Sequence, residues 1–244
     1  MNLKPFAKPV VFLYSMAVAL MAGLLVAYAC SIASPQQIAD ALQNSPTLNS
    51  SLQSCAMAAM LTKESGGGNT CASNSCCVGI GQLNVSSNGL DLSQYGLTRA
   101  QYQNADIQTQ INVWAVAANS NTQSSGYQTL NAAYQSGQPI DGFPVTAGDL
   151  AACEQFGAAV CNHNVASLQS TGACGSYTDG NTHTGGQTIC SWGATADKQA
   201  ASQTCSLANN NCPIGPGDFP GATSVASQAP APAATDVKVA ANQV

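Results

Sequence analysis

Cysteine placement constrains this chain more than any other feature of its sequence. An even number of cysteines in an exported chain predicts up to five disulfide bonds. Zinc binding would need short paired spacings such as C-x2-C, which are absent, and the adjacent Cys76 and Cys77 are a poor chelate for one tetrahedral ion. The pattern favours a disulfide-linked fold in an oxidising compartment, with no metal and no cofactor. The ten cysteines counted here follow the apolar N-terminal segment: Cys55, Cys71, Cys76, Cys77, Cys153, Cys161, Cys174, Cys190, Cys205 and Cys212.

The N-terminus has the pattern of an export signal or a membrane anchor. Two lysines precede an uncharged, mostly apolar run over residues 9–33. This run is long enough to span a membrane, but Ala27-Tyr28-Ala29 and Ser31-Ile32-Ala33 present the small residues that a signal peptidase reads. We expect residues 1–33 to be a signal peptide or anchor, with cleavage favoured. Cys30 lies inside this segment and is left out of the disulfide count; its lipidation is a less favoured alternative.

The charge content excludes one class of partner. Only 7% of residues are charged, and the formal net charge is -5. No basic patch is available to neutralise phosphates, so nucleic acid is not an expected partner. Amides and hydroxyls dominate the polar residues, and these groups can hydrogen-bond to sugar rings.

The apolar spacing predicts a mainly α fold, with helices over residues 35–42, 50–65, 105–119, 128–134 and 145–160. The stretch 69–84 should form a loop or short strands with a local disulfide among its three cysteines. Residues 161–212 are polar and show little periodicity. We therefore expect four parts: the signal or anchor, a domain over 34–157, a loop-rich and disulfide-rich extension over 158–212, and a disordered Pro/Ala-rich tail over 213–244.

Glu64 is the first candidate for chemistry. Glu64 and Glu154 are the only glutamates in the chain. Glu64 is expected on the last turn of an apolar helix that Gly66 ends, where the helix dipole and apolar neighbours both raise the pKa of a carboxyl group. A protonated acid of this kind is what glycoside cleavage needs. The alternative is that Glu64 is a solvated surface residue beside Lys63.

Three segments give Glu64 a context: Lys63-Glu64-Ser65-Gly66, Gly79-Ile80-Gly81-Gln82-Leu83-Asn84 and Ala132-Ala133-Tyr134-Gln135-Ser136-Gly137. In order and approximate spacing they resemble the signature segments of the soluble lytic transglycosylase family. The resemblance covers roughly residues 34–157 and implies an α+β, lysozyme-like fold. Two positions depart from the family pattern: Gly81 replaces a bulkier residue, and Gln135 replaces an asparagine.

The resemblance also implies roles for individual residues. Glu64 would act first as acid and then as base, Gln82 would line the sugar cleft, and Tyr134 would position the Glu64 carboxyl group. Ser65 would orient the cleft backbone or contact a sugar. Each residue has a plainer alternative: Gln82 as a loop amide, Tyr134 as a core aromatic and Ser65 as a polar residue at a helix end.

The implied activity is cleavage of the bond between N-acetylmuramic acid and N-acetylglucosamine in peptidoglycan, with a 1,6-anhydro product. A hydrolytic lysozyme usually needs a second carboxylate near the first. Asp91 and Asp106 are the aspartates within plausible reach, and each is expected to cap a helix or turn instead. Glu154, His163 and His183 are not assigned to a metal site.

Three alternatives stay open: a hydrolytic lysozyme, a non-catalytic peptidoglycan-binding or assembly protein, and a disulfide-stabilised secreted interaction protein. The expected location is periplasmic or otherwise extracytoplasmic, with possible anchoring through residues 9–33. The expected partners are peptidoglycan glycan strands. Association with a secretion, conjugation or phage-entry complex is an inference from the family alone.

Overall fold

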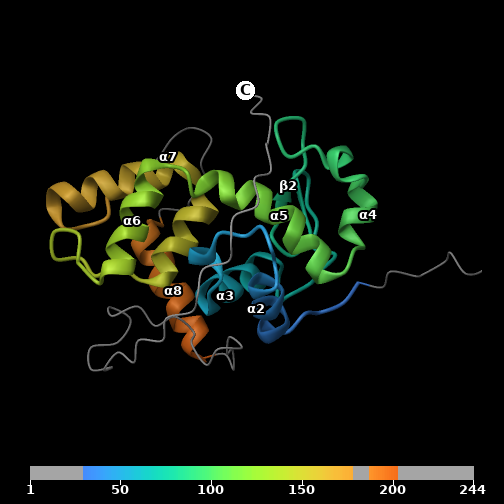
Figure 1. The fold of residues 1–244 in the computed structure, drawn as a ribbon, viewed down its shortest axis with the longest axis horizontal. Helices are drawn as coiled ribbons and strands as arrows, with labels where there is room; N and C mark the ends of the chain where they lie inside the picture. Colours follow the sequence, from blue (N-terminus) through green and yellow to red (C-terminus); the bar gives the residue numbers. More distant parts are fainter. Residues whose placement is uncertain (1–29, 178–186, 203–244) are drawn as a thin grey trace, which may run out of the picture.

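A computed structural model describes residues 30–177 and 187–202 (Figure 1). The predicted tail, and all of the predicted signal or anchor before Cys30, lie outside these residues. Within the two described ranges, no helix is both long enough and apolar enough to cross a membrane.

The described chain is mainly helical, as its sequence predicts. Two short strands, β1 (Cys77–Val78) and β2 (Leu83–Asn84), form an antiparallel hairpin in which Val78 faces Leu83. The 3-10 helices are η1 (Ser50–Leu52) and η2 (Leu92–Tyr95). The α-helices are α2 (Pro35–Gln43), α3 (Cys55–Glu64), α4 (Arg99–Gln103), α5 (Ile107–Asn121), α6 (Ser125–Ser136), α7 (Ala147–Thr171) and α8 (Ile189–Ser202).

Side-chain caps fix where several helices begin. The Ser34 hydroxyl accepts from the Gln37 backbone N–H, and Pro35 occupies the first turn of α2. Thr146 caps α7 in the same way, as predicted. Asp106 caps α5 and Asp91 caps η2, which confirms the capping roles expected of both aspartates.

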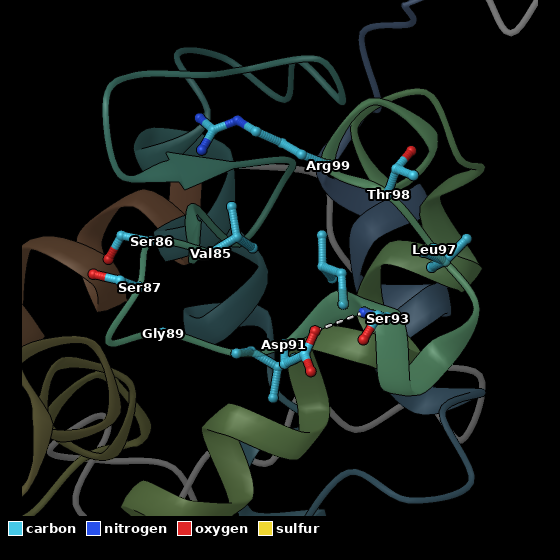
Figure 2. Close-up of a pocket in the computed structure, with 11 residues that line it drawn as sticks. Val85, Ser86, Ser87, Gly89, Asp91, Ser93, Leu97, Thr98 and Arg99 are labelled. Atoms are coloured by element: carbon cyan, nitrogen blue, oxygen red, sulfur yellow. Dashed lines mark hydrogen bonds between the residues drawn. The ribbon is translucent and has the colours of Figure 1, made fainter.

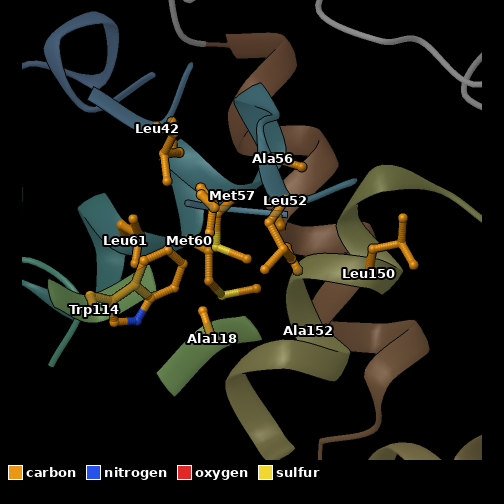
Figure 3. Packing of buried hydrophobic residues seen from close by; sticks show 14 of the residues in the cluster. Leu42, Leu52, Ala56, Met57, Met60, Leu61, Trp114, Ala118, Leu150 and Ala152 are labelled. Atoms are coloured by element: carbon orange, nitrogen blue, oxygen red, sulfur yellow. The ribbon is translucent and has the colours of Figure 1, made fainter. Parts of the chain in front are cut away.

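Helix α3 is the central element. Its first seven residues, 55–61, are all buried, so this helix is apolar on every side rather than on one stripe. In Figure 1, α6, α7 and α8 lie to one side of α3, and the hairpin with α4 lies to the other. Figure 3 shows the core around α3, which includes Leu42, Leu52, Met57, Met60, Leu61, Trp114 and Leu150.

The N-terminal boundary predicted at residue 34 was wrong, because residues 30–33 belong to the fold. Cys30 forms a disulfide with Cys71, although it lies outside the predicted set of ten paired cysteines. Ile32 forms a β-bridge with Asn69, and the Ala33 N–H donates to the Gly68 carbonyl at 2.8 Å. The Cys30 sulfur is therefore not free for a lipid, and cleavage after Ala33 would cut the chain between the folded domain and a segment that pairs with it.

The loop-rich extension was also predicted wrongly where the structure describes it. Helix α7 continues to Thr171, and residues 189–202 form α8, which packs on both α7 and α3. A side chain at Gly148 or Gly193 would collide with the facing helix, so α7 and α8 approach closely through small residues. The buried stripe of α8, Ile189, Gly193 and Ala196, contains only one large apolar residue, which is why the periodicity does not reveal this helix.

Disulfides join elements at several points. Cys76 pairs with Cys77, which confirms the predicted local disulfide. Cys153 and Cys161 are linked across Gly157, where the backbone of α7 breaks with a φ of 78°. Cys174–Cys190 connects the segment after α7 to α8. None of the cysteines in the described ranges is free.

Candidate functional site

Glu64 is the last residue of α3, and its side chain is half-buried. The helix ends there because Gly66, Gly67 and Gly68 all adopt positive φ values, of 68°, 98° and 87°. Burial raises the pKa of the Glu64 carboxyl group, and the neighbouring charge of Lys63 opposes this effect. The carboxyl group therefore keeps its proton to a higher pH than an ordinary glutamate.

Ser65 secures the glycine turn that follows Glu64. Its side chain is 2% exposed. Its hydroxyl donates to the Leu61 carbonyl at 2.7 Å and accepts from the Gly68 N–H at 3.0 Å. These bonds give Ser65 a role in orienting the backbone around Glu64, while its contact with a sugar stays a prediction.

Gln82 lies in the turn between β1 and β2, with a left-handed φ of 44°. Its Nε2 donates to the Gly79 carbonyl at 3.0 Å, and its Oε1 accepts from Asn74 Nδ2 at 3.0 Å. The amide is therefore held in one orientation by its own loop. Its contact with a sugar stays a prediction.

The loop that contains the Cys76–Cys77 disulfide holds the Asn74 side chain that contacts Gln82. Asn74, which orients Gln82, accepts through its Oδ1 from the N–H groups of Cys76 and Cys77, at 3.0 and 2.9 Å. The Arg99 guanidinium donates to the Asn74 carbonyl at 2.6 Å and binds the same loop at other carbonyls. Asn74 and Arg99 were not identified from the sequence, because the bond from Asn74 to Gln82 and the bonds from Arg99 to the loop depend on the folded hairpin.

Gly81 is a glycine for a steric reason. A Cβ atom at this position would overlap the ring of Trp114, which comes from α5 and is 3% exposed. The tryptophan occupies the space that a larger side chain at position 81 would take. The turn is also held by the buried Gln110, whose Oε1 accepts from the Ile80 N–H at 2.8 Å.

Tyr134 is buried near the C-terminal end of α6, which Gly137 ends in the left-handed conformation. Its place one turn before the end of a helix agrees with the predicted helical segment. Its predicted contact with Glu64 stays a prediction.

Glu154 is the second glutamate, and it lies on α7 with 5% of its side chain exposed. Burial raises its pKa to about 7; a hydrogen bond from Asn121 opposes this shift, and the charge of Glu64 adds to it. The sequence does not mark Glu154 as part of one site with Glu64, since 90 residues separate them.

Trp192 of α8 joins the two helices that carry the glutamates. Lys63 Nζ lies 3.2 Å from the centroid of the indole ring, and the Phe156 ring lies 5.7 Å from it. The indole N–H also donates to the sulfur of Met60 at 2.6 Å. Trp192 was not identified from the sequence, because it falls in the stretch predicted to be irregular.

A pocket of about 620 Å³ lies beside the hairpin and begins at Val85, the residue after β2 (Figure 2). Asp91 and Ser93 share a hydrogen bond in it, and Arg99 lies apart from them in the same view. Neither Glu64 nor Gln82 lines this pocket. Its lining residues are Val85, Ser86, Ser87, Gly89, Leu90, Asp91, Leu92, Ser93, Leu97, Thr98 and Arg99.

Within residues 30–177 and 187–202, no group of three or more His, Cys, Asp or Glu side chains is arranged to hold a metal ion. His163 is exposed, but it lies on α7 rather than in the expected loop. Its ring packs beside Tyr177, with centroids 5.1 Å apart. His183 lies outside the described residues.

Comparison with known proteins found no counterpart. No protein-family model matches the chain, and neither does any curated protein or solved structure.

Proposed function

We propose that this chain is a peptidoglycan lytic transglycosylase in which Glu64 is the catalytic acid and base. One observation carries the proposal: Glu64 is a half-buried carboxyl group at the end of a core helix, and burial raises its pKa. A glycosidase needs a protonated acid of this kind at neutral pH to donate to the leaving oxygen.

The family resemblance supports a lysozyme-like arrangement. The helix end with Glu64, the β1–β2 turn with Gln82 and the end of α6 with Tyr134 correspond to the three signature segments. In the proposed reaction, Glu64 donates its proton as the bond between N-acetylmuramic acid and N-acetylglucosamine breaks. The Glu64 carboxylate then takes the proton of the muramic acid 6-hydroxyl group as its oxygen attacks the anomeric carbon, which gives the 1,6-anhydro sugar.

The setting of Glu154 favours a transglycosylase over a hydrolytic lysozyme. A retaining or inverting hydrolase uses a second, ionised carboxylate that reaches the sugar or a water molecule. Glu154 is buried, and its pKa of about 7 keeps it largely uncharged in mildly acidic solution. Asp91 and Asp106 are occupied in capping.

The proposed location is extracytoplasmic, which the disulfides of the described chain support because such bonds persist in oxidising compartments. The proposed partner is the glycan strand of peptidoglycan. Service to a secretion, conjugation or phage-entry complex, and anchoring through residues 9–33, belong to the same proposal.

Mass spectrometry of peptidoglycan digests tests the activity. Purified protein should release muropeptides with 1,6-anhydro ends, and Glu64→Gln should release none while Asp106→Asn remains active. Reducing ends would identify a hydrolytic lysozyme instead. No product from the wild-type protein, together with binding to insoluble peptidoglycan, would identify a non-catalytic wall-binding protein.

A further inference from the structure

The Cys76–Cys77 disulfide is placed to act locally. It joins neighbouring residues, whereas three other disulfides of the described chain span sequence separations of 8, 16 and 41 residues. A disulfide stabilises a fold mainly by constraining the unfolded chain, and more so for longer loops, so a bond between neighbours adds little to global stability. Its effect falls instead on the backbone of residues 76 and 77, which it closes into a small ring.

The peptide groups of this ring hold the Asn74 side chain. The N–H groups of Cys76 and Cys77 donate to Asn74 Oδ1 at 3.0 and 2.9 Å, and the Asn74 N–H donates back to the Cys77 carbonyl at 3.0 Å. Asn74 Nδ2 in turn donates to Gln82 Oε1 at 3.0 Å. One asparagine therefore connects the disulfide ring to the amide that is proposed to bind the glycan strand.

The hold on Asn74 depends on the ring. Residues 73–75 are exposed, so burial does not fix this part of the loop. Arg99 donates to the Asn74 carbonyl at 2.6 Å and so anchors the main chain, whereas the N–H groups of the ring orient the side chain. The disulfide limits the backbone torsion angles at Cys76 and Cys77, and these angles decide whether both N–H groups face one oxygen. Opening the ring therefore loosens the hold on Gln82.

A reductant can reach this disulfide. Cys76 and Cys77 are half-buried and follow the exposed residues 73–75, whereas Cys153 and Cys161 are 1% and 0% exposed. Thiol–disulfide exchange requires a thiolate to approach a sulfur atom, so access decides which bonds react in the folded protein. The ring can therefore open while the buried disulfide on α7 stays closed.

We propose that the Cys76–Cys77 disulfide is a redox switch that positions Gln82. In the switching step, a thiolate of a dithiol reductant attacks one sulfur, the S–S bond breaks, and a mixed disulfide forms that the second thiol of the reductant resolves. The reductant leaves as a disulfide, and its electrons and protons end on the thiols of Cys76 and Cys77. The oxidised form holds Gln82, and the reduced form releases it. The consequence for glycan binding rests on the proposed function.

Alkylation followed by mass spectrometry tests the exchange. Folded protein treated with dithiothreitol and then with iodoacetamide should be labelled at Cys76 and Cys77 while Cys153 and Cys161 stay paired. Labelling of Cys76 and Cys77 that appears only as the protein unfolds would overturn the inference.

NMR tests the effect on Gln82 without any assay of activity. In protein labelled with nitrogen-15 at its glutamine side-chain amides, the Gln82 signal is identified by its loss in Gln82→Ala. Reduction and Cys76→Ser/Cys77→Ser should each shift this signal and speed the exchange of its protons with water. Cys174→Ser/Cys190→Ser, which removes a half-buried disulfide at α8, should leave the signal in place. A Gln82 signal that does not move on reduction would overturn the inference.

A second comparison isolates the ring from the Cys30–Cys71 disulfide, in which Cys30 is exposed. Dithiothreitol should cause no further change of the Gln82 signal in Cys76→Ser/Cys77→Ser, because the proposed switch is already open in that variant. A further change of the same size as in the wild-type protein would assign the effect to another disulfide and overturn the inference.

Kinetics test the consequence for the proposed activity. Reduction should raise the KM for glycan strands about fivefold, the effect of losing about one hydrogen bond, with little change in kcat. A fall in kcat at constant KM would overturn the inference. Release of Gln82 on reduction, with no muropeptide product from the oxidised protein, would refute the proposed function alone. Muropeptide release with a KM that does not respond to reduction would refute this inference alone.

Discussion

The end of α3 and the middle of α7 each carry one of the two glutamates of the chain, but they bury it in different ways. Glu64 follows from local chemistry, since an apolar helix stops at three glycines. Glu154 lies on a helix that packs on its chain neighbours α6 and α8 and on α3, which lies far earlier in the sequence. The first carboxyl group is half-buried and the second is almost fully buried. The comparison shows that a candidate acid can be found from sequence, whereas the degree of burial that raises the pKa of a carboxyl group depends on packing.

The largest expected effect is the loss of activity on substitution of Glu64. Glu64→Gln removes the proposed proton donor, and loss of a general acid typically lowers a rate by about 10²–10⁴-fold. The side chain is half-buried and lies outside the buried core of α3, so the melting temperature should change little. Muropeptide release and thermal denaturation measure the two properties, and a variant that melts normally with full activity would exclude Glu64 as the acid.

The next largest expected effect is the fall in stability that the buried Glu154 causes as the pH rises. Its pKa is about 7 in the folded chain, against 4.5 for a glutamate exposed to water, so the folded protein binds more protons between these values. The Glu154 contribution to stability is therefore highest below about pH 4.5 and falls as pH rises towards 7, by up to about 3 kcal/mol at about 1.4 kcal/mol per pKa unit. Denaturant unfolding at pH 5 and pH 8 measures this fall. Glu154→Gln should reduce the fall by more than Asp197→Asn, because burial also raises the pKa of Asp197 but its side chain is only half-buried. A larger reduction from Asp197→Asn would contradict this account.

A third prediction tests the close packing of Gly81, in the β1–β2 turn, against Trp114. Gly81→Ala places a Cβ atom into the ring of Trp114, and overpacking of this kind costs about 1–3 kcal/mol. Gly142→Ala is the control, because a Cβ atom there meets nothing within 4 Å, although its φ is positive, at 83°. A lower unfolding midpoint for Gly142→Ala than for Gly81→Ala would contradict the account of Trp114.

The smallest effect is expected at Asn74. Asn74→Ala removes hydrogen bonds to Gln82 and to the backbone N–H groups of Cys76 and Cys77, each worth about 1 kcal/mol. We expect a modest loss of stability and a raised KM for glycan strands with little change in kcat, because Gln82 is proposed to bind and not to react. The double variant Cys76→Ser/Cys77→Ser should reproduce the KM effect. A fall in kcat alone would argue against this role.

Much of the site could be predicted from the chain, and the rest could not. The glycine turn after Glu64, the caps at Ser34, Asp106 and Thr146 and the local disulfide all depend on residues close in sequence. Two contacts are different, because only the folded hairpin brings their partners within reach: the bond from Asn74 to Gln82 and the bonds from Arg99 to the backbone of the loop over residues 74–77.

By itself, the sequence determined the helical class, the end of α3 before Gly66 and the rarity of glutamate that makes Glu64 and Glu154 distinctive. Tertiary structure alone decided that Cys30 pairs with Cys71, that α8 packs on α7 through Gly148 and Gly193, and that Glu154 is almost fully buried. The physical reason is the distance along the chain over which each kind of interaction acts. Caps and turns depend on bonds within a few residues, whereas burial depends on which helices pack together.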